Sequence, residues 1–406
     1  MNNIFKYIIK ITKIQSWYDK MELYYSKIEN YNKLKDNNNN NNNNLNIFLD
    51  KVFSNLNKNI NEYNNILIKP NVLGPYPPER NATTHPLFLE WIINYLLNCG
   101  VDKNKIIVGD SSGYDTNKSF KVSKLQEVCE KYSIKWLPFE KDETVSLDIM
   151  NNNSSEVPLP KCVLNCDLII NLPKLKTHIL MKYTGAVKNL YGCIPGGTKP
   201  KLHGIYAKEE DFAKFTVELH NKIIENKEII SIIDGIEGME GDGPSNGKTK
   251  KSKIVVGSSI PVLVDIFCGY YIGYKDNDLF INNILKKQNN ITNFKINNVN
   301  INNGKINTIN SNNINTINPI KFKKPTTYFL ISIMPPKLVK LVFSFMVQKP
   351  KINKRKCRLC KICEHICPVN AIDLSNFKVN EKKCINCYCC HEMCGFDAIK
   401  LKRKFI

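Results

Sequence analysis

The chain has 406 residues, which is enough for two or three domains, and its hydrophobic content of 42% is ordinary for a globular protein. Its formal net charge is +21, yet only four of its 58 basic residues are arginine, the side chain that best reads bases and phosphates. Because lysine and asparagine are abundant throughout, the charge reflects a general bias in composition and argues against nucleic acid as the partner.

Residues 1–60 predict an N-terminal extension. A short amphipathic stretch leads into eight consecutive asparagines at 37–44, and a polyasparagine run cannot bury a core. Residues 1–21 carry neither the small-residue cleavage site of a secretory signal nor the arginine- and serine-rich composition of a transit peptide. We therefore expect a cytoplasmic location, with import into an organelle left open.

Residues 61–280 alternate between strand and helix patterns. Apolar runs that end in polar residues predict buried strands at 65–70, 105–110, 134–139, 166–173, 229–234 and 253–257. Helical patterns separate many of them, at 84–100, 121–132, 212–225 and 260–274. This alternation predicts an α/β domain with a largely parallel sheet covered by helices.

Polar side chains that follow these strands are the candidates for ligand binding, because ligands of such sheets bind beyond the carboxyl ends of the strands. They are Asn71, Asp110, Lys174, Lys176, His178 and Asp234, joined by Lys188 and Asn189 on a helix that begins near residue 184 and by His203 in a later loop. Lys174, Lys176 and His178 alternate, so an extended segment places them on one face, where three donors suit a carboxylate or a phosphate. The alternatives are a solvated charged loop for the first three and an exposed helical face for Lys188 and Asn189.

Two segments connect this domain to the C-terminus. Residues 281–325 are an asparagine-rich linker or insert, which favours a disordered insertion. Residues 326–349 form an apolar connecting segment, in which two prolines and two lysines interrupt the best apolar stretch at 328–347. Since a span needs about 20 mostly apolar residues, we predict no transmembrane helix.

Residues 350–406 carry a doubled cysteine motif. The first run has the C-x2-C-x2-C-x3-C-P spacing of bacterial-type ferredoxins, and a shift of 27 residues superimposes it on a second run. In this spacing the fourth cysteine of each run binds the cluster of the other run. The predicted ligands are Cys357, Cys360, Cys363 and Cys394 for the first [4Fe–4S] cluster, and Cys384, Cys387, Cys390 and Cys367 for the second.

A fifth cysteine in the second run, Cys389, aligns with Ile362 and is expected to be a small apolar filler. Zinc sites use two separated cysteine pairs rather than a triple run, and a disulfide framework suits a short secreted chain. The tail therefore resembles the two-cluster ferredoxin family, which implies a small α+β domain. It departs from the pattern at Gly395, where the first run has Pro368.

The α/β region contains, in order, the motifs IKPNVL, ATTHP, VGDSSGY, CDLIINLPKLKTH, TGAVKNLYGCIPG, IIDGIEGMEGDGP and VLVDIFCGYYIGY. These motifs resemble the domain of unknown function 362 family over about residues 62–275, and several members of that family also end in a two-cluster ferredoxin tail. The resemblance implies iron–sulfur binding and a redox role, and it names no substrate. The asparagine-rich stretches depart from the family pattern and are expected to be inserts.

Together these features predict an iron–sulfur redox protein with two [4Fe–4S] clusters. Its α/β domain would bind an anionic small molecule or cofactor, to or from which the clusters pass electrons. The alternative is a non-enzymatic electron carrier whose α/β domain docks a partner protein or acts as an assembly scaffold. The expected partners are a redox protein, an anionic small molecule, or both, and the sequence leaves open whether the chain is an enzyme.

Overall fold

A computed structural model describes residues 21–38, 43–150, 156–206, 208–325, 349–385 and 387–402. The amphipathic start of the chain, part of the polyasparagine run and the apolar stretch at 328–347 lie outside these residues. Within the described ranges, none of the helices has the length and apolar character needed to cross a bilayer.

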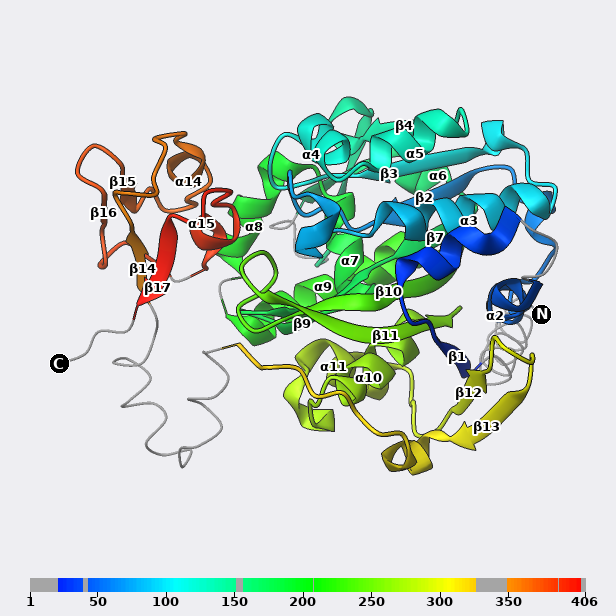
Figure 1. Cartoon of the computed structure of the whole chain (residues 1–406). Helices are drawn as coiled ribbons and strands as arrows, with labels where there is room; N and C mark the ends of the chain where they lie inside the picture. The colour runs from blue at the N-terminus through cyan, green and yellow to red at the C-terminus, as the bar shows by residue number, and fades with distance from the viewer. Residues whose placement is uncertain are drawn as a thin grey trace, which may run out of the picture.

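One mixed, mostly parallel sheet forms the centre of the α/β domain, as predicted (Figure 1). Its strands lie in the order β13-β12-β1-β11-β10-β7-β2-β3-β4. The parallel part contains β2 (Ile66–Pro70), β3 (Ile106–Asp110), β4 (Lys135–Pro138), β7 (Leu168–Leu172) and β10 (Glu228–Glu240). The remaining strands are β11 (Lys248–Ser258), β1 (Glu22–Lys27), β12 (Lys295–Val299) and β13 (Ile306–Asn310). A separate hairpin pairs β5 (Thr144–Asp148) with β6 (Glu156–Pro160).

Helices cover both faces of the sheet, so the central strands are buried on both sides. Along β2, Ile66 and Ile68 point into one apolar core and Leu67 into the other. The first core includes α2 (Asn43–Phe53), α3 (Pro86–Asn98), α4 (Thr116–Val122) and α5 (Leu125–Lys131). The second includes α6 (Lys161–Asn165), α7 (Ala186–Asn189), α8 (Lys199–Ile205), α9 (Glu209–Ile224), α10 (Pro261–Tyr271) and α11 (Phe280–Gln288).

The strand order reverses between β2 and β7. From β2 the chain moves outward to β3 and β4, and it then returns to place β7 on the other side of β2. Beyond Pro173 the chain continues from β7 as β8 (Lys174–His178), which pairs with β10 and with β9 (Lys182–Thr184). Open α/β sheets bind ligands at such a reversal, beyond the carboxyl ends of the strands.

The N-terminal segment differs from the predicted extension, because residues 21–38 belong to the fold. Strand β1 lies between β11 and β12, and Leu23 is fully buried. Helix α2 also buries Phe48 and Leu49. The asparagine-rich composition hid two short apolar patterns that are long enough to reach the core.

The segment at 281–325 also differs from the predicted disordered linker. Residues 295–310 form β12 and β13 at the edge of the main sheet, and α11 packs against α9. In this edge pair only a few residues, such as Ile296 and Val299, need to reach the core. Asparagine side chains are held by polar neighbours, as where Thr308 Oγ1 donates to Asn297 Oδ1 over 2.7 Å.

The C-terminal domain repeats its own backbone at the interval seen in the sequence. Its elements are β14 (Lys349–Ile352), α14 (Ile362–His365), β15 (Ile372–Asp373), β16 (Lys378–Val379), α15 (Cys389–Glu392) and β17 (Ile399–Lys402). Helices α14 and α15 occupy equivalent positions, and each follows a residue with a φ of 60°, Lys361 or Tyr388. The antiparallel pairing of β14 with β17 joins the two ends of the domain, which lies beside α8 (Figure 1).

Candidate anion cavity and cysteine clusters

A cavity of about 120 Å³ lies beyond the carboxyl ends of β2, β3 and β7, where the strand order reverses. Eight of the nine candidate side chains predicted from the α/β sequence belong to residues that line it. These are Asn71, Asp110, Lys174, Lys176, His178, Lys188, Asn189 and His203. The ninth, Asp234, is fully buried in an ion pair with Lys174. The structure therefore brings together residues from separate segments, as expected for an open α/β sheet.

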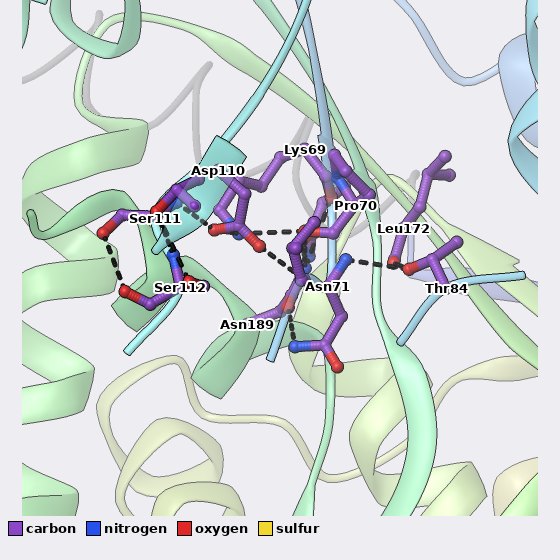
Figure 2. Close-up of polar contacts among 12 residues, drawn as sticks. Lys69, Pro70, Asn71, Thr84, Asp110, Ser111, Ser112, Leu172 and Asn189 are labelled. Carbon is purple, nitrogen blue, oxygen red and sulfur yellow. Dashed lines mark hydrogen bonds and ion pairs between the residues drawn. The ribbon is translucent and has the colours of Figure 1, made fainter. Parts of the chain in front are cut away.

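Lys176 begins a chain of hydrogen bonds along the sheet edge. Its Nζ donates to Asn71 Oδ1 and to the carbonyl oxygen of Ala82, both over 2.6 Å. Asn71 Nδ2 donates to Asn189 Oδ1 over 3.0 Å (Figure 2). Asn189 Nδ2 in turn donates to Asn171 Oδ1 over 2.8 Å. Each amide is thereby oriented by its neighbours, so the polar wall of the cavity is rigid before any ligand arrives.

A buried ion pair that sequence reasoning missed lies beside this network. Lys69 Nζ is 2.6 Å from Asp110 Oδ1, and Asp110 Oδ2 accepts the backbone N–H of Val72 over 2.6 Å (Figure 2). Burial raises the pKa of Asp110, and the neighbouring lysines Lys69 and Lys199 oppose that rise. A lysine inside the buried run ILIKP was a usable signal, since a fully buried lysine requires a partner.

Lys174 and Asp234 support the floor of the cavity. Lys174 Nζ lies 2.9 Å from Asp234 Oδ2 and 2.6 Å from Tyr31 Oη, and Tyr31 in turn donates to Asp234 Oδ1 over 2.8 Å. Burial lowers the pKa of Lys174, while Asp234 opposes that shift. Tyr31 comes from the segment predicted to be an extension, so the sequence could not suggest this contact.

The segment Lys174–His178 is a buried strand, so the alternative of a solvated loop is wrong. His178 Nδ1 accepts the backbone N–H groups of Leu180 (3.1 Å) and Met181 (3.2 Å). Burial, followed by the charge of Lys188, holds the pKa of His178 well below its usual range. The imidazole is therefore neutral with its proton on Nε2, which makes it a hydrogen-bond donor.

Helix α8 adds two basic residues, Lys199 and His203, to the cavity lining. Lys199 Nζ donates to the carbonyl oxygen of Ser111, and burial lowers the pKa of Lys199 to about 8 against the opposing charge of Asp110. His203 stacks on Phe212 with ring centroids 4.5 Å apart, and burial lowers the pKa of His203 to about 3. Among the described residues, nothing hydrogen-bonds the buried Nδ1 of His203.

Helix α7 owes its position to a carboxylate from α10. Asp265 accepts the backbone N–H groups of Ala186 (2.6 Å) and Val187 (3.0 Å) at the start of α7. A Cβ at Gly185 would lie only 1.9 Å from Asp265 Oδ1, so a glycine is required for this close approach. Lys188, half-buried, and Asn189, buried, are thereby held at the cavity, which is why the exposed-face alternative is wrong.

The lining is basic. In the described part of the chain it includes four lysines, two histidines and a single aspartate, which already pairs with Lys69. One of the lysines, Lys174, is paired with Asp234. The arrangement suits an anion, because Lys176, Lys188 and Lys199 can each make a charge-assisted hydrogen bond to a ligand in the cavity.

The ferredoxin domain forms part of the cavity wall, which sequence reasoning did not predict. Ile366, Cys389 and Met393 all contribute to the lining. A Cβ at Gly113 would lie 2.3 Å from Met393 Cε, and a Cβ at Gly204 on α8 would lie 3.0 Å from Pro368 Cβ. Two glycines of the α/β domain therefore allow the C-terminal domain to approach closely.

The cysteines of the tail gather into the two predicted sets, each around its own cavity. Cys357, Cys360, Cys363 and Cys394 line one, and Cys367, Cys384, Cys387 and Cys390 line the other. The crossed fourth ligands also accept equivalent backbone hydrogen bonds, from Ala371 to Cys367 Sγ (3.1 Å) and from Ala398 to Cys394 Sγ (3.2 Å). Among the described residues, no group of three or more His, Cys, Asp or Glu is arranged to hold a single metal ion. The thiol donors and the enclosed space fit iron–sulfur clusters.

Cys389, the spare cysteine, has a more specific place than a filler. It is buried and lines both the second cysteine cavity and the anion cavity. Its equivalent Ile362 lines the first cysteine cavity only. Cys389 therefore forms part of the wall between the second cysteine cavity and the candidate anion cavity.

Comparisons with known proteins agree with this division of the chain. A 4Fe-4S binding domain model matches residues 350–373. The thylakoid-associated protein sll1697 of Synechocystis sp. is 28% identical over 194 residues, which cover 48% of this chain and 58% of that protein. The structure of the lactate racemase apoprotein from Thermoanaerobacterium thermosaccharolyticum aligns at a TM-score of 0.35 and 12% identity, covering 61% of this chain and 57% of that one. A model described as "Domain of unknown function (DUF362)" matches residues 66–269, half of the chain, and the chain belongs to that family.

Proposed function

We propose that this iron–sulfur protein carries two [4Fe–4S] clusters and exchanges electrons between them and a small anion bound in the α/β cavity. The shared wall supports the proposal, since Cys389 borders both the lysine-lined cavity and the second cysteine set. An anion held by the lysines would lie one side chain away from a cluster site. When bound, the clusters supply one-electron transfer.

The size of the cavity limits the anion. An engineered apolar cavity of about 150 Å³ holds benzene, so a space of about 120 Å³ suits a molecule of roughly six non-hydrogen atoms. A small carboxylate fits within this volume. Lys176, Lys188 and Lys199 would bind its charge, His178 Nε2–H would donate to it, and Met393 would exclude water.

Anaerobically purified protein tests this function, because the anion should be retained as added mass in native mass spectrometry. Gly113→Val should lower its occupancy several-fold at unchanged iron content, since the new side chain takes the space of the Met393 methyl group, which must then move within the cavity lining. Gly197→Val is the matched control, because a Cβ at Gly197 meets no atom within 4 Å. If wild-type protein holds no anion, or both variants hold it equally, the electron-carrier alternative is favoured.

Anion binding should weaken as the pH rises through about 8. Burial lowers the pKa of Lys199 to about 8, so the free protein has the charged amine below that pH and loses it above. Anion retention should therefore fall between about pH 7 and about pH 9.5. Lys199→Arg should make anion retention independent of pH over this range, because guanidinium stays protonated. Lys201→Ala, which changes an exposed neighbour on α8, should leave the pH dependence of anion retention as in the wild type. A wild-type profile as flat as that of Lys199→Arg would exclude Lys199 from the binding site.

A further inference from the structure

The ferredoxin domain has an outer face that the anion cavity does not use. We define it as residues 354–361 together with Phe396. It surrounds the first cysteine set, in which Cys360 is exposed, whereas the second set adjoins the α/β domain through Cys389. The two sets meet inside the domain, where Cys363 and Cys390 share one apolar cluster with Leu374 and Ile399. None of the residues of the outer face lines the anion cavity, although Met393 lines both that cavity and the first cysteine cavity.

The outer face is basic in a way that composition does not explain. Five exposed cationic side chains follow one another in the loop, at Lys354, Arg355, Lys356, Arg358 and Lys361. Two of the four arginines of the whole chain lie here, although lysine is the preferred basic residue everywhere else. The nearby carboxylate of Asp397 forms ion pairs with Lys356 (3.5 Å) and Lys400 (2.6 Å). Its ion pairs are therefore with lysines and not with Arg355 or Arg358. Arginine is weakly hydrated and is enriched at protein interfaces.

Two large apolar side chains are exposed in the same place. Leu359 is 55% exposed and Phe396 is 47% exposed, and they are two of only five exposed large hydrophobic residues in the described part of the chain. Phe396 lines the first cysteine cavity beside Arg358 and Cys360, and Leu359 stands between those two residues in sequence. Leu359 also has a φ of 51°, a conformation that glycine or asparagine would adopt more easily. An apolar centre with a basic rim is the anatomy of a protein interface.

We propose that the outer face docks an acidic one-electron carrier protein, which exchanges electrons with the cluster of the first cysteine set. The proposal rests on the two-cluster function above. Each encounter moves one electron, so that one redox centre is oxidised and the other reduced by one unit, with no bond made or broken. Anionic lipid or nucleic acid would match the charge as well, but neither offers a redox centre to the exposed Cys360 edge.

Binding of full-length, anaerobically purified holoprotein to an acidic plant-type ferredoxin tests the proposal. Binding should weaken as salt rises, because the contact is electrostatic. Arg355→Glu/Arg358→Glu should weaken it at least about tenfold at low salt and flatten the salt dependence. Leu359→Ser should weaken it at every salt concentration. Lys118→Glu/Lys121→Glu, an equal charge reversal on exposed residues of α4, should bind as wild type, and all variants should keep their iron.

Two results would overturn the assignment. One is that wild-type protein does not bind the acidic ferredoxin, or that the α4 control weakens binding as much as the arginine variant. The other is that vesicles containing phosphatidylserine, or a short DNA duplex, bind in preference and lose binding in the arginine variant. The anion cavity is tested separately, because Lys176→Met with an emptied cavity should still bind the acidic ferredoxin as wild type does.

Discussion

Cys390→Ala should lose about half of the iron, from about eight to about four atoms per chain, whereas Cys389→Ala should keep all of it. The two residues are adjacent, but only Cys390 belongs to the set with Cys384, Cys387 and Cys367, and Cys389 aligns with Ile362. Iron and sulfide analysis of anaerobically reconstituted protein measures both. Cys389→Ala is the matched control for Cys390→Ala, because the two side chains are adjacent, buried and identical in size.

Cys360→Ala extends the test to the other set and should also lose about half of the iron. Zinc in place of iron, near four irons in the wild-type chain, or iron loss from Cys389→Ala with retention in Cys390→Ala would each refute the two-cluster assignment. If Cys389→Ala keeps its iron, the variant can be used to study the wall between the second cysteine cavity and the anion cavity, because Cys389 lines both cavities.

Lys176→Met should abolish retention of the anion, or weaken its binding tenfold or more, while the iron remains. A charge-assisted hydrogen bond contributes about 1.5–3 kcal/mol, and Lys176 is the buried amine that links Asn71 and Ala82 at the cavity edge. Methionine keeps the volume and removes the charge. Native mass spectrometry gives the occupancy, and thermal unfolding gives the stability.

Two controls accompany Lys176→Met. Lys201→Ala on the exposed face of α8 should retain the anion. Lys174→Ala is expected to destabilise the fold by about 3–5 kcal/mol, because it leaves the buried carboxylate of Asp234 without its ion-pair partner. A loss of the anion in this variant would therefore reflect lost stability. Normal anion retention in a folded, iron-replete Lys176→Met protein would show that this lysine only supports the sheet edge.

The sequence predicted what local patterns determine. Apolar runs such as Leu168–Leu172 identified the central strands, and the cysteine spacing identified sets that the structure gathers around two cavities. Sequence patterns did not predict β1 and β12, because each of these strands is short and has only a few apolar residues within a polar segment. An asparagine-rich segment can therefore be ordered when it pairs with the edge of a sheet whose other strands provide most of the apolar core.

Long-range contacts in the candidate site were beyond the sequence. Tyr31 reaches Lys174 only because β1 joins the sheet, and Lys69 pairs with Asp110 only because β2 lies beside β3. The approach of Met393 to Gly113 depends on the docking of two domains. The periodicity of a sequence shows which face of a helix or strand a residue occupies. These contacts also depend on which helices, strands and domains pack against one another, and periodicity does not show that.

The close packing of Pro368 against Gly204 has a consequence for the internal duplication of the tail. Its counterpart, Gly395, has open space around its Cβ position, so only one half of the duplicated domain can sit against α8 in this way. The repeat at an interval of 27 residues pairs Pro368 with Gly395 and Ile362 with Cys389, and only Pro368 and Cys389 of these four face the α/β domain. The duplication is therefore asymmetric where it meets the α/β domain, and in the proposed electron exchange the two cysteine sets would not be interchangeable, because Cys389 separates the second set from the anion cavity whereas Met393 separates the first.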